Sequence, residues 1–318
     1  MSKEKKIKHV AVLKGGMSRE REVSLSSGKG VAKALKQVGY QVTEIDVGHD
    51  VSKKLCEIKP DVAFIALHGP YGEDGCIQGM LEIMRIPYTH SGVAASAVAM
   101  NKPLAKVLME AAGIPTPPGK VMTAKKLGEL SRAKKLPMPK PFVVKPLNDG
   151  SSVGVLIVRE KDKFMFNEKD WTFGPDALVE KFIPGRELSV AVLGDRALGI
   201  IEIVPKVNFY DYKAKYTVGK AEHLLPAPIH KKAYKQIQEY AVMAHKALGC
   251  RGVSRLDLRY DDTRGEPGKI YVLEVNTHPG MTPLSLTPEM AAHEAISYEE
   301  LVDYLVKNAT LENKSIRK

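Results

Sequence analysis

Two short apolar runs near the end of the chain carry acidic side chains at a spacing that could hold a metal ion. Residues 253–260 and 269–276 are rich in Val, Leu, Ile and Tyr, and a polar turn containing Asp, Gly and Pro separates them. This pattern is typical of a β-hairpin. Symmetric closure of the turn predicts three facing pairs: Tyr260 with Tyr271, Asp257 with Glu274, and Arg255 with Asn276.

Two facing carboxylates need a compensating positive charge. Facing Cβ atoms lie roughly 5 Å apart, and like charges at that distance repel by about 3 kcal/mol at an effective dielectric constant of about 20. A divalent cation bound by Asp257, Glu274 and Asn276 would supply that charge, and oxygen-only donors favour magnesium or manganese over zinc. The alternative is a salt network in which Arg255 and Arg259 neutralise the acids, and the two strands by themselves leave both interpretations open.

The segment that follows the second run favours the metal interpretation. Residues 277–285 are too rich in Pro, Gly and Thr to continue a strand or a helix, so we expect a loop. Loops that a rigid sheet holds in place are where ligands usually meet a protein. A ligand site beyond this strand end is therefore expected.

The composition indicates an ordinary globular protein with a small anionic substrate. With 318 residues, 44% of them hydrophobic, the chain is long enough for two or three compact units. Its net charge of +11 comes from basic residues spread along the chain without a nucleic-acid-binding motif, so we expect a small anion and no nucleic acid as partner. There is no secretory signal, no apolar run of membrane-spanning length, and no disulfide or zinc pattern among the three cysteines. We expect a cytoplasmic protein.

The first hundred residues alternate between strand and helix patterns. Residues 9–13 and 61–67 are buried-strand patterns, and the alternation predicts a parallel, doubly wound sheet with ligands beyond the carboxyl ends of its strands. Glu20 follows the first strand, where it either complements a helix dipole or binds a substrate ammonium group. His68 and Glu73 follow the later strand on the same side, as loop hydrogen-bonding groups or as part of that site.

The middle of the chain contains a second set of candidate groups. A proline cluster at 114–118 indicates that a new domain begins close to Asn101. Lys145 precedes the Gly-Ser segment 148–154, which is either a phosphate-binding loop or a plain flexible hairpin, and the Walker A pattern is absent. Residues 205–229 form a long irregular segment, which predicts a lid.

Several motifs in one order then carry a resemblance to a known family. They read Gly-Gly-Met-Ser-Arg-Glu-Arg-Glu-Val-Ser over 15–24, His-Gly-Pro-Tyr-Gly-Glu-Asp-Gly over 68–75, Lys-Pro-Leu-Asn-Asp-Gly-Ser-Ser-Val-Gly over 145–154, Phe-Tyr-Asp-Tyr-Lys-Ala-Lys-Tyr over 209–216 and Leu-Glu-Val-Asn-Thr-His-Pro-Gly-Met-Thr over 273–282. Together they resemble the D-alanine-D-alanine ligases, ATP-grasp enzymes of peptidoglycan precursor synthesis. The resemblance implies a three-domain α/β fold of the ATP-grasp type: a parallel N-terminal domain (1–101) and two α+β domains (102–187 and 188–318) whose antiparallel sheets clasp ATP.

The resemblance also implies a role for individual residues. The implied contacts with ATP are Lys102, Lys145, Ser151, Ser152, Val153, Glu180, Lys181, Ile183, Glu187 and Lys215. The implied ligands of two magnesium ions, or of manganese, are Asp257, Glu274 and Asn276. The implied substrate-binding and catalytic groups are Glu20 linked to Ser151 and Tyr216 at the first D-alanine, His68 beside it, Ser285 and Leu286 at the second D-alanine, and Arg255 with the Gly280 N–H at the oxyanion.

The reaction implied by the resemblance joins two D-alanines through a D-alanyl phosphate, with release of ADP and phosphate. A related ligase with D-lactate or D-serine as acceptor is the alternative. The chain departs from the family pattern at Pro70-Tyr71, at Ser254 and at His278, which puts the specificity of the second substrate site in doubt. A homodimer is a further expectation from the family.

Overall fold

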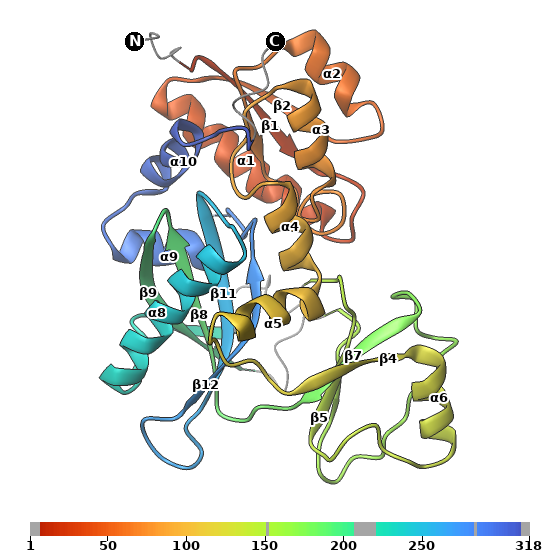
Figure 1. The fold of residues 1–318 in the computed structure, drawn as a ribbon. Coiled ribbons are helices and arrows are strands. Elements are labelled where there is room, and N and C mark those ends of the chain that lie inside the picture. The colour runs from red at the N-terminus through yellow and green to blue at the C-terminus, as the bar shows by residue number, and fades with distance from the viewer. Residues whose placement is uncertain (1–6, 151–152, 207–220, 283–284, 313–318) are drawn as a thin grey trace.

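The computed structural model describes residues 7–150, 153–206, 221–282 and 285–312, and it contains three β-sheets with helices packed around them (Figure 1). The sheet nearest the amino terminus is parallel and the other two are antiparallel, which confirms the predicted class of fold. Of the helices in the described ranges, none is long and apolar enough to cross a membrane.

The parallel sheet has the order β2-β1-β3 and is covered by helices on both faces. Val10 and Val12 of its central strand pack with Leu35 on one face, whereas Ala11 and Leu13 belong to a second cluster on the other face. Burial on both sides explains why this strand is apolar without alternation. Its elements are β1 (His9–Lys14), α1 (Arg21–Val38), β2 (Gln41–Asp46), α2 (Val51–Ile58), β3 (Val62–Ile65), α3 (Cys76–Met84) and α4 (Val93–Met100).

The second sheet has the order β4-β7-β5-β6 and lies at the lower right in Figure 1. A small cluster built around Phe142 and Leu127 forms its core. The sequence did not predict β4, a strand at the edge of this sheet. Most side chains of that strand are exposed and show no alternation of apolar and polar residues. The elements are β4 (Gly119–Thr123), α6 (Ala124–Arg132), β5 (Phe142–Lys145), β6 (Leu156–Val158) and β7 (Asp176–Lys181).

The third sheet has the order β10-β9-β8-β11-β12. Its outer strand β10 lies inside the segment 205–229 that was predicted to be irregular, and it pairs with β9. That prediction was wrong for these residues, because a strand of four residues is too short to give a periodic signal. The elements are β8 (Arg186–Leu193), β9 (Arg196–Pro205), β10 (Ala221–Leu224), α8 (Lys231–Ala247), β11 (Val253–Asp261) and β12 (Lys269–Asn276).

The β11–β12 hairpin has the predicted pairing at the acids but not at the tyrosines. Asp257 faces Glu274, as expected, whereas Tyr260 faces Ile270 and not Tyr271. The register shifts by one residue next to Asp257, where Leu273 has no partner on β11. Such a bulge bends a strand and cannot be recognised from the turn sequence alone.

Three further helices connect the sheets. The apolar side of α5 (Lys102–Ala111) packs on the third sheet, and its residue Met109 belongs to the same core as Val275 of β12. After α9 (Leu286–His293), α10 (Tyr298–Lys307) begins with the predicted capping box and returns to the N-terminal sheet, where it packs on α1. The division at residues 101 and 187 stays a prediction.

Candidate active site

The facing acids of the hairpin each have a basic partner. Arg255 donates to Asp257 from Nε and Nη2 at 2.8 and 2.7 Å, and Lys102 Nζ lies 3.2 Å from a carboxylate oxygen of Glu274. Arg259 instead bonds to the Ile183 carbonyl, 3.1 Å away, at the other end of the strand. The predicted salt network is therefore correct for Arg255 and wrong for Arg259. Lys102, and not Arg259, is the basic partner of Glu274, because α5 lies against the hairpin.

These acids remain suited to a hard cation. A carboxylate offers about four lone-pair sites, so the two bonds from Arg255 and the one from Ser189 still leave acceptor capacity on Asp257. Within the described ranges no three His, Cys, Asp or Glu side chains gather as a metal site, so a third protein ligand from a side chain would be of another type, such as an amide. Asn276 Oδ1 fits that place, because the His278 N–H donates to it at 2.8 Å and orients its carbonyl. The donor set fits magnesium or manganese.

Lys102 connects the hairpin to the Gly-Ser loop of the second sheet. It is the first residue of α5, and Asn101 caps the helix by accepting from the Leu104 N–H at 3.1 Å. The Lys102 ammonium group donates to the Asp149 carbonyl at 2.6 Å, and its backbone N–H donates to the Leu147 carbonyl at 3.0 Å. The side chain is buried, so it can neutralise an anion without being free to leave the site.

Glu20 reaches the same loop from the N-terminal sheet. A Cβ placed on Gly150 would lie 3.5 Å from one carboxylate oxygen of Glu20, and a Cβ placed on Gly69 would lie 2.8 Å from that same oxygen. The carboxylate therefore lies between the loop after Lys145 and the loop after His68. In this position it could bind an ammonium group that is held between the two loops.

A buried carboxylate sits beneath the second candidate lysine. Glu180 is only 3% exposed and pairs with Lys145 and with Lys106, whose Nζ lies 3.1 Å away. A carboxylate in such a place is stable only when it is paired. Lys145 is thus held in place at the end of β5, and since an ammonium group has three donors it can also bind a phosphate oxygen.

His68 is held in a buried hydrogen-bonded chain. Its Nδ1 lies 3.2 Å from Glu73 and its Nε2 lies 3.2 Å from Ser27 Oγ. Burial by itself lowers the pKa of His68, but the hydrogen bond to Glu73 and the charges of Glu73 and Glu20 outweigh it and raise the pKa above its ordinary value. His278, also buried, has its pKa lowered well below the usual range by loss of solvent.

Most of the remaining predicted residues have described positions, and four lie outside the described ranges. Gly280 lies beside Ser285, the residue before α9, because a Cβ on Gly280 would be 2.8 Å from Ser285 Oγ; Leu286 is the first residue of that helix. At the start of the third sheet, Glu187 pairs with Arg259 at 3.5 Å. Lys181 is exposed, Ile183 is buried and Val153 is half-buried. Four predicted residues lie outside the described ranges: Ser151, Ser152, Lys215 and Tyr216.

Two side chains that contact the predicted site residues were not predicted from the sequence. Ser189 donates to Asp257 from the neighbouring strand, and Lys106 pairs with Glu180. A signal for Lys106 was present: it stands four residues after Lys102, so both lysines share one face of α5. On that helix the two lysines are buried beside Ala105 and Met109, whereas Leu104 and Val107 are exposed.

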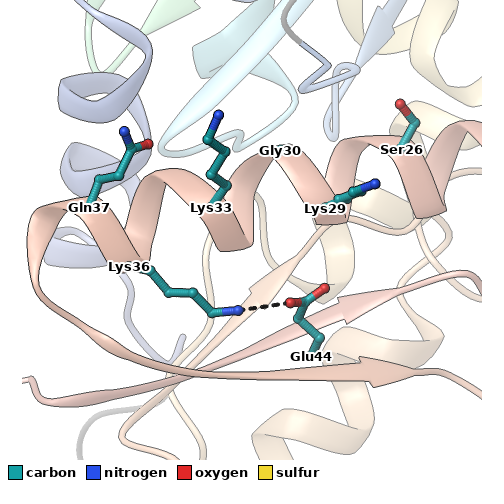
Figure 2. A pocket seen from close by; sticks show the side chains of 7 residues that line it. All are labelled: Ser26, Lys29, Gly30, Lys33, Lys36, Gln37 and Glu44. Atoms are coloured by element: carbon teal, nitrogen blue, oxygen red, sulfur yellow. Dashed lines mark hydrogen bonds and ion pairs between the residues drawn. The ribbon is translucent and has the colours of Figure 1, made fainter.

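A separate hollow lies over α1 and β2, on the N-terminal sheet (Figure 2). Lys29, Lys33 and Lys36 line it, and Lys36 pairs with Glu44 at 3.1 Å. None of the predicted site residues that the structure describes lines this hollow. It is therefore distinct from the candidate active site.

Comparison with known proteins gives matches over nearly the whole chain. The family models described as D-ala D-ala ligase C-terminus and N-terminus match residues 108–307 and 49–91. A D-alanine-D-alanine ligase of Methylobacterium radiotolerans is 54% identical over 308 residues, which cover 96% of this chain and 99% of the relative.

Solved structures agree with that similarity. The D-alanine-D-alanine ligase of Bacillus anthracis complexed with ATP has a TM-score of 0.76 at 31% identity, over 95% of this chain and 97% of that one. The VanG D-Ala:D-Ser ligase of Enterococcus faecalis has a TM-score of 0.76 at 30% identity, over 95% and 99%. By sequence identity and by coverage of its full length, the chain belongs to the D-alanine-D-alanine ligase family.

Proposed function

We propose that this protein joins two molecules of D-alanine with the consumption of ATP. The observation that carries the proposal is that the hairpin, the Gly-Ser loop and the segment of Glu20 come together around Lys102. Its ammonium group contacts Glu274 of the hairpin and the Asp149 carbonyl of the Gly-Ser loop, and the next residue of that loop, Gly150, lies against Glu20. An acid pair for a cation, lysines for phosphate and a carboxylate for an ammonium group thus surround one place.

In the first step a carboxylate oxygen of D-alanine attacks the γ-phosphorus of ATP, and ADP leaves. Phosphoryl transfer requires positioning and charge neutralisation rather than covalent help from the protein. Lys102 and Lys145 provide fixed positive charges, while Glu20 holds the ammonium group of the first D-alanine. Magnesium bound to Asp257, Glu274 and Asn276 would draw charge from the phosphate oxygens.

In the second step the amine of the other D-alanine attacks the carbonyl carbon of the acyl phosphate. An oxyanion forms, and it collapses as the carbon–oxygen bond to phosphate breaks; the nitrogen loses a proton, and the departing phosphate takes one up. Arg255 and the Gly280 N–H are the proposed donors to that oxyanion, and one such donor contributes roughly 3 kcal/mol to many enzymes. The two bonds to Asp257 hold Arg255 in place. Ser285 and Leu286 would receive the carboxylate of the second substrate.

An assay with ATP, magnesium and D-alanine tests this function. Phosphate release and a dipeptide of the expected mass should both appear with D-alanine as the sole amino acid, and chelation of magnesium should stop both. Parallel reactions with D-serine or D-lactate test the alternative acceptors. If phosphate release requires D-serine or D-lactate, the protein is a related ligase that uses that acceptor in place of the second D-alanine.

The proposed partner of the protein in solution is a second copy of the same chain. On α5 the two lysines point inward and are less than a tenth exposed, whereas Val107 is 62% exposed and Leu104 and Leu108 flank it. Leu104 is 53% exposed, and Ile83 of α3 is 86% exposed, so both helices present apolar side chains to solvent. Exposed apolar side chains that lie together on one helix often mark a protein–protein contact.

Replacing Val107 by Glu tests the proposed interface. We expect light scattering to give a dimer for the unchanged protein and a monomer for Val107→Glu, because burying an unpaired carboxylate is costly. Val121→Glu is the control, since Val121 is also exposed but lies on β4. A wild-type monomer at micromolar concentration, or a Val107→Glu dimer, would rule the interface out.

A further inference from the structure

The loop 277–281 after β12, here called the Gly280 loop, is held by the N-terminal part of the chain at two places. On one side of Gly280, the Gln78 amide of α3 lies 3.2 Å from Nε2 of His278, although 200 positions separate the two residues. On the other side, the Met281 N–H donates to Ser27 Oγ of α1 at 3.3 Å. Gly280 therefore lies between two tethers.

The first tether is buried and held by further contacts. Gln78 Nε2 also donates to the Gly72 carbonyl at 2.8 Å, which fixes the amide, and the His278 ring packs on His90 with 4.8 Å between ring centroids. Nδ1 of His278 lies 3.0 Å from Thr277 Oγ1, so a proton on Nδ1 leaves Nε2 as the acceptor for Gln78. Gln78, His90 and His278 are all buried, so bulk solvent does not compete for the contact.

We infer that Gln78 and His278 are positioning residues, which set the Gly280 N–H at the point where the oxyanion of the second step forms. The inference rests on the proposed function. Neither side chain needs to touch substrate, because each acts through the backbone of the Gly280 loop. A preorganised donor stabilises a developing charge only at the correct distance, and a misplacement of about 1 Å can cost on the order of a hundredfold in rate.

The test separates the two half-reactions. Exchange of ¹⁸O between the β,γ-bridge and the β-non-bridging positions of ATP, with D-alanine present, reports formation of the acyl phosphate, while dipeptide formation reports its capture. In His278→Leu and Gln78→Leu we expect dipeptide formation to fall roughly tenfold to a hundredfold, while the exchange rate stays within about threefold and KM for ATP is unchanged. His278→Gln, whose amide oxygen can accept from Gln78, should recover most of the lost rate.

Gln37→Leu is the matched control, because Gln37 is exposed on α1. Equal losses of exchange and dipeptide, no loss at all, or loss of folding in both leucine variants by thermal melting would overturn the inference, since each outcome denies a role confined to the second step. Absence of D-alanine-dependent phosphate release in the unchanged protein would instead contradict the proposed function.

Discussion

Glu274 and Asp257 face each other on the hairpin, and each carboxylate has its own cation from a different part of the structure. Arg255 is two residues away from Asp257 on the same strand, whereas Lys102 comes from α5. These pairs lower the repulsion between the acids before any ion binds. The acids are thereby held in register for a divalent cation.

Glu274→Gln is expected to lower D-alanine-dependent ATP turnover at least about a hundredfold, because it removes one anionic ligand of the proposed metal site. The side chain is 29% exposed and its amide would still accept from Lys102, so the melting temperature should change by no more than about 2 °C. Glu239→Gln, at an exposed position on α8, is the control. Unchanged phosphate release in Glu274→Gln would refute the metal assignment.

At the scale of elements, one tight turn joins the second sheet to the third. Gly185 lies between β7 and β8 with φ +86°, a conformation that side chains other than glycine rarely adopt. A Cβ there would overlap the Tyr260 carbonyl oxygen of β11, and the Gly185 carbonyl accepts from Arg259 at 2.6 Å. The turn thus holds the end of β7 against the β11–β12 hairpin.

Gly185→Ala is expected to lower the free energy of unfolding by about 2–4 kcal/mol, because strain and overlap with backbone act together. Gly174→Ala is the matched control: its φ is +93°, but a Cβ there meets nothing within 4 Å. Urea denaturation of both variants isolates the contribution of the overlap. Equal losses of stability in the two would show that the close approach to β11 has no effect.

Packing of α8 on β11 predicts how stability depends on pH. His245 is buried and hydrogen-bonded to Ser254 at 2.7 Å, and burial, with a smaller effect of Lys246, lowers its pKa to about 4. Because the folded-state pKa is below that of the unfolded chain, the stabilisation is complete above about pH 6.5 and is lost as the pH falls toward 4.

His245→Gln should remove a slope of about 1.4 kcal/mol per pH unit from the unfolding free energy in that window. Urea titrations at pH 7, 6 and 5 measure it, with the exposed His49→Gln as control. If both variants follow the wild-type slope, His245 does not titrate on unfolding as described.

At the scale of the whole molecule, the N-terminal sheet and the third sheet share one core and one polar seam. Val10 of β1 and Ile201 of β9 belong to the same buried cluster. Arg251, which precedes β11, donates to the His90 and Thr310 carbonyls at 2.8 Å each and lies 4.7 Å from the Tyr88 ring centroid. This seam adjoins the first tether of the Gly280 loop, because His90 accepts from Arg251 and its ring packs on His278.

Arg251→Lys is expected to lower the free energy of unfolding by about 2 kcal/mol, because a lysine cannot donate in two fixed directions and lie flat on a ring. Arg264→Lys, in the exposed β11–β12 turn, is the control. If urea denaturation shows that the free energy of unfolding of Arg251→Lys changes by less than about 0.5 kcal/mol, the seam contributes little to the stability of the fold.

The sequence by itself determined the hairpin, the facing pair Asp257 and Glu274, and the order of most helices and strands. These features depend on local signals: apolar periodicity, turn composition and helix caps act over a few residues. The exposed strand β4 and the four-residue strand β10 were missed, because neither has such a period. The Tyr260–Tyr271 pairing was wrong because a bulge depends on what the neighbouring strand contacts.

Only the tertiary structure decided which groups surround the acids. Lys102 reaches Glu274 because the apolar side of α5 packs on the third sheet, and Glu20 lies beside Gly150 because two separate sheets approach each other there. No local pattern encodes these contacts, since they join residues far apart in the chain. The sequence therefore determined the chemical types in the site, and the packing of α5 and the sheets determined how they are combined.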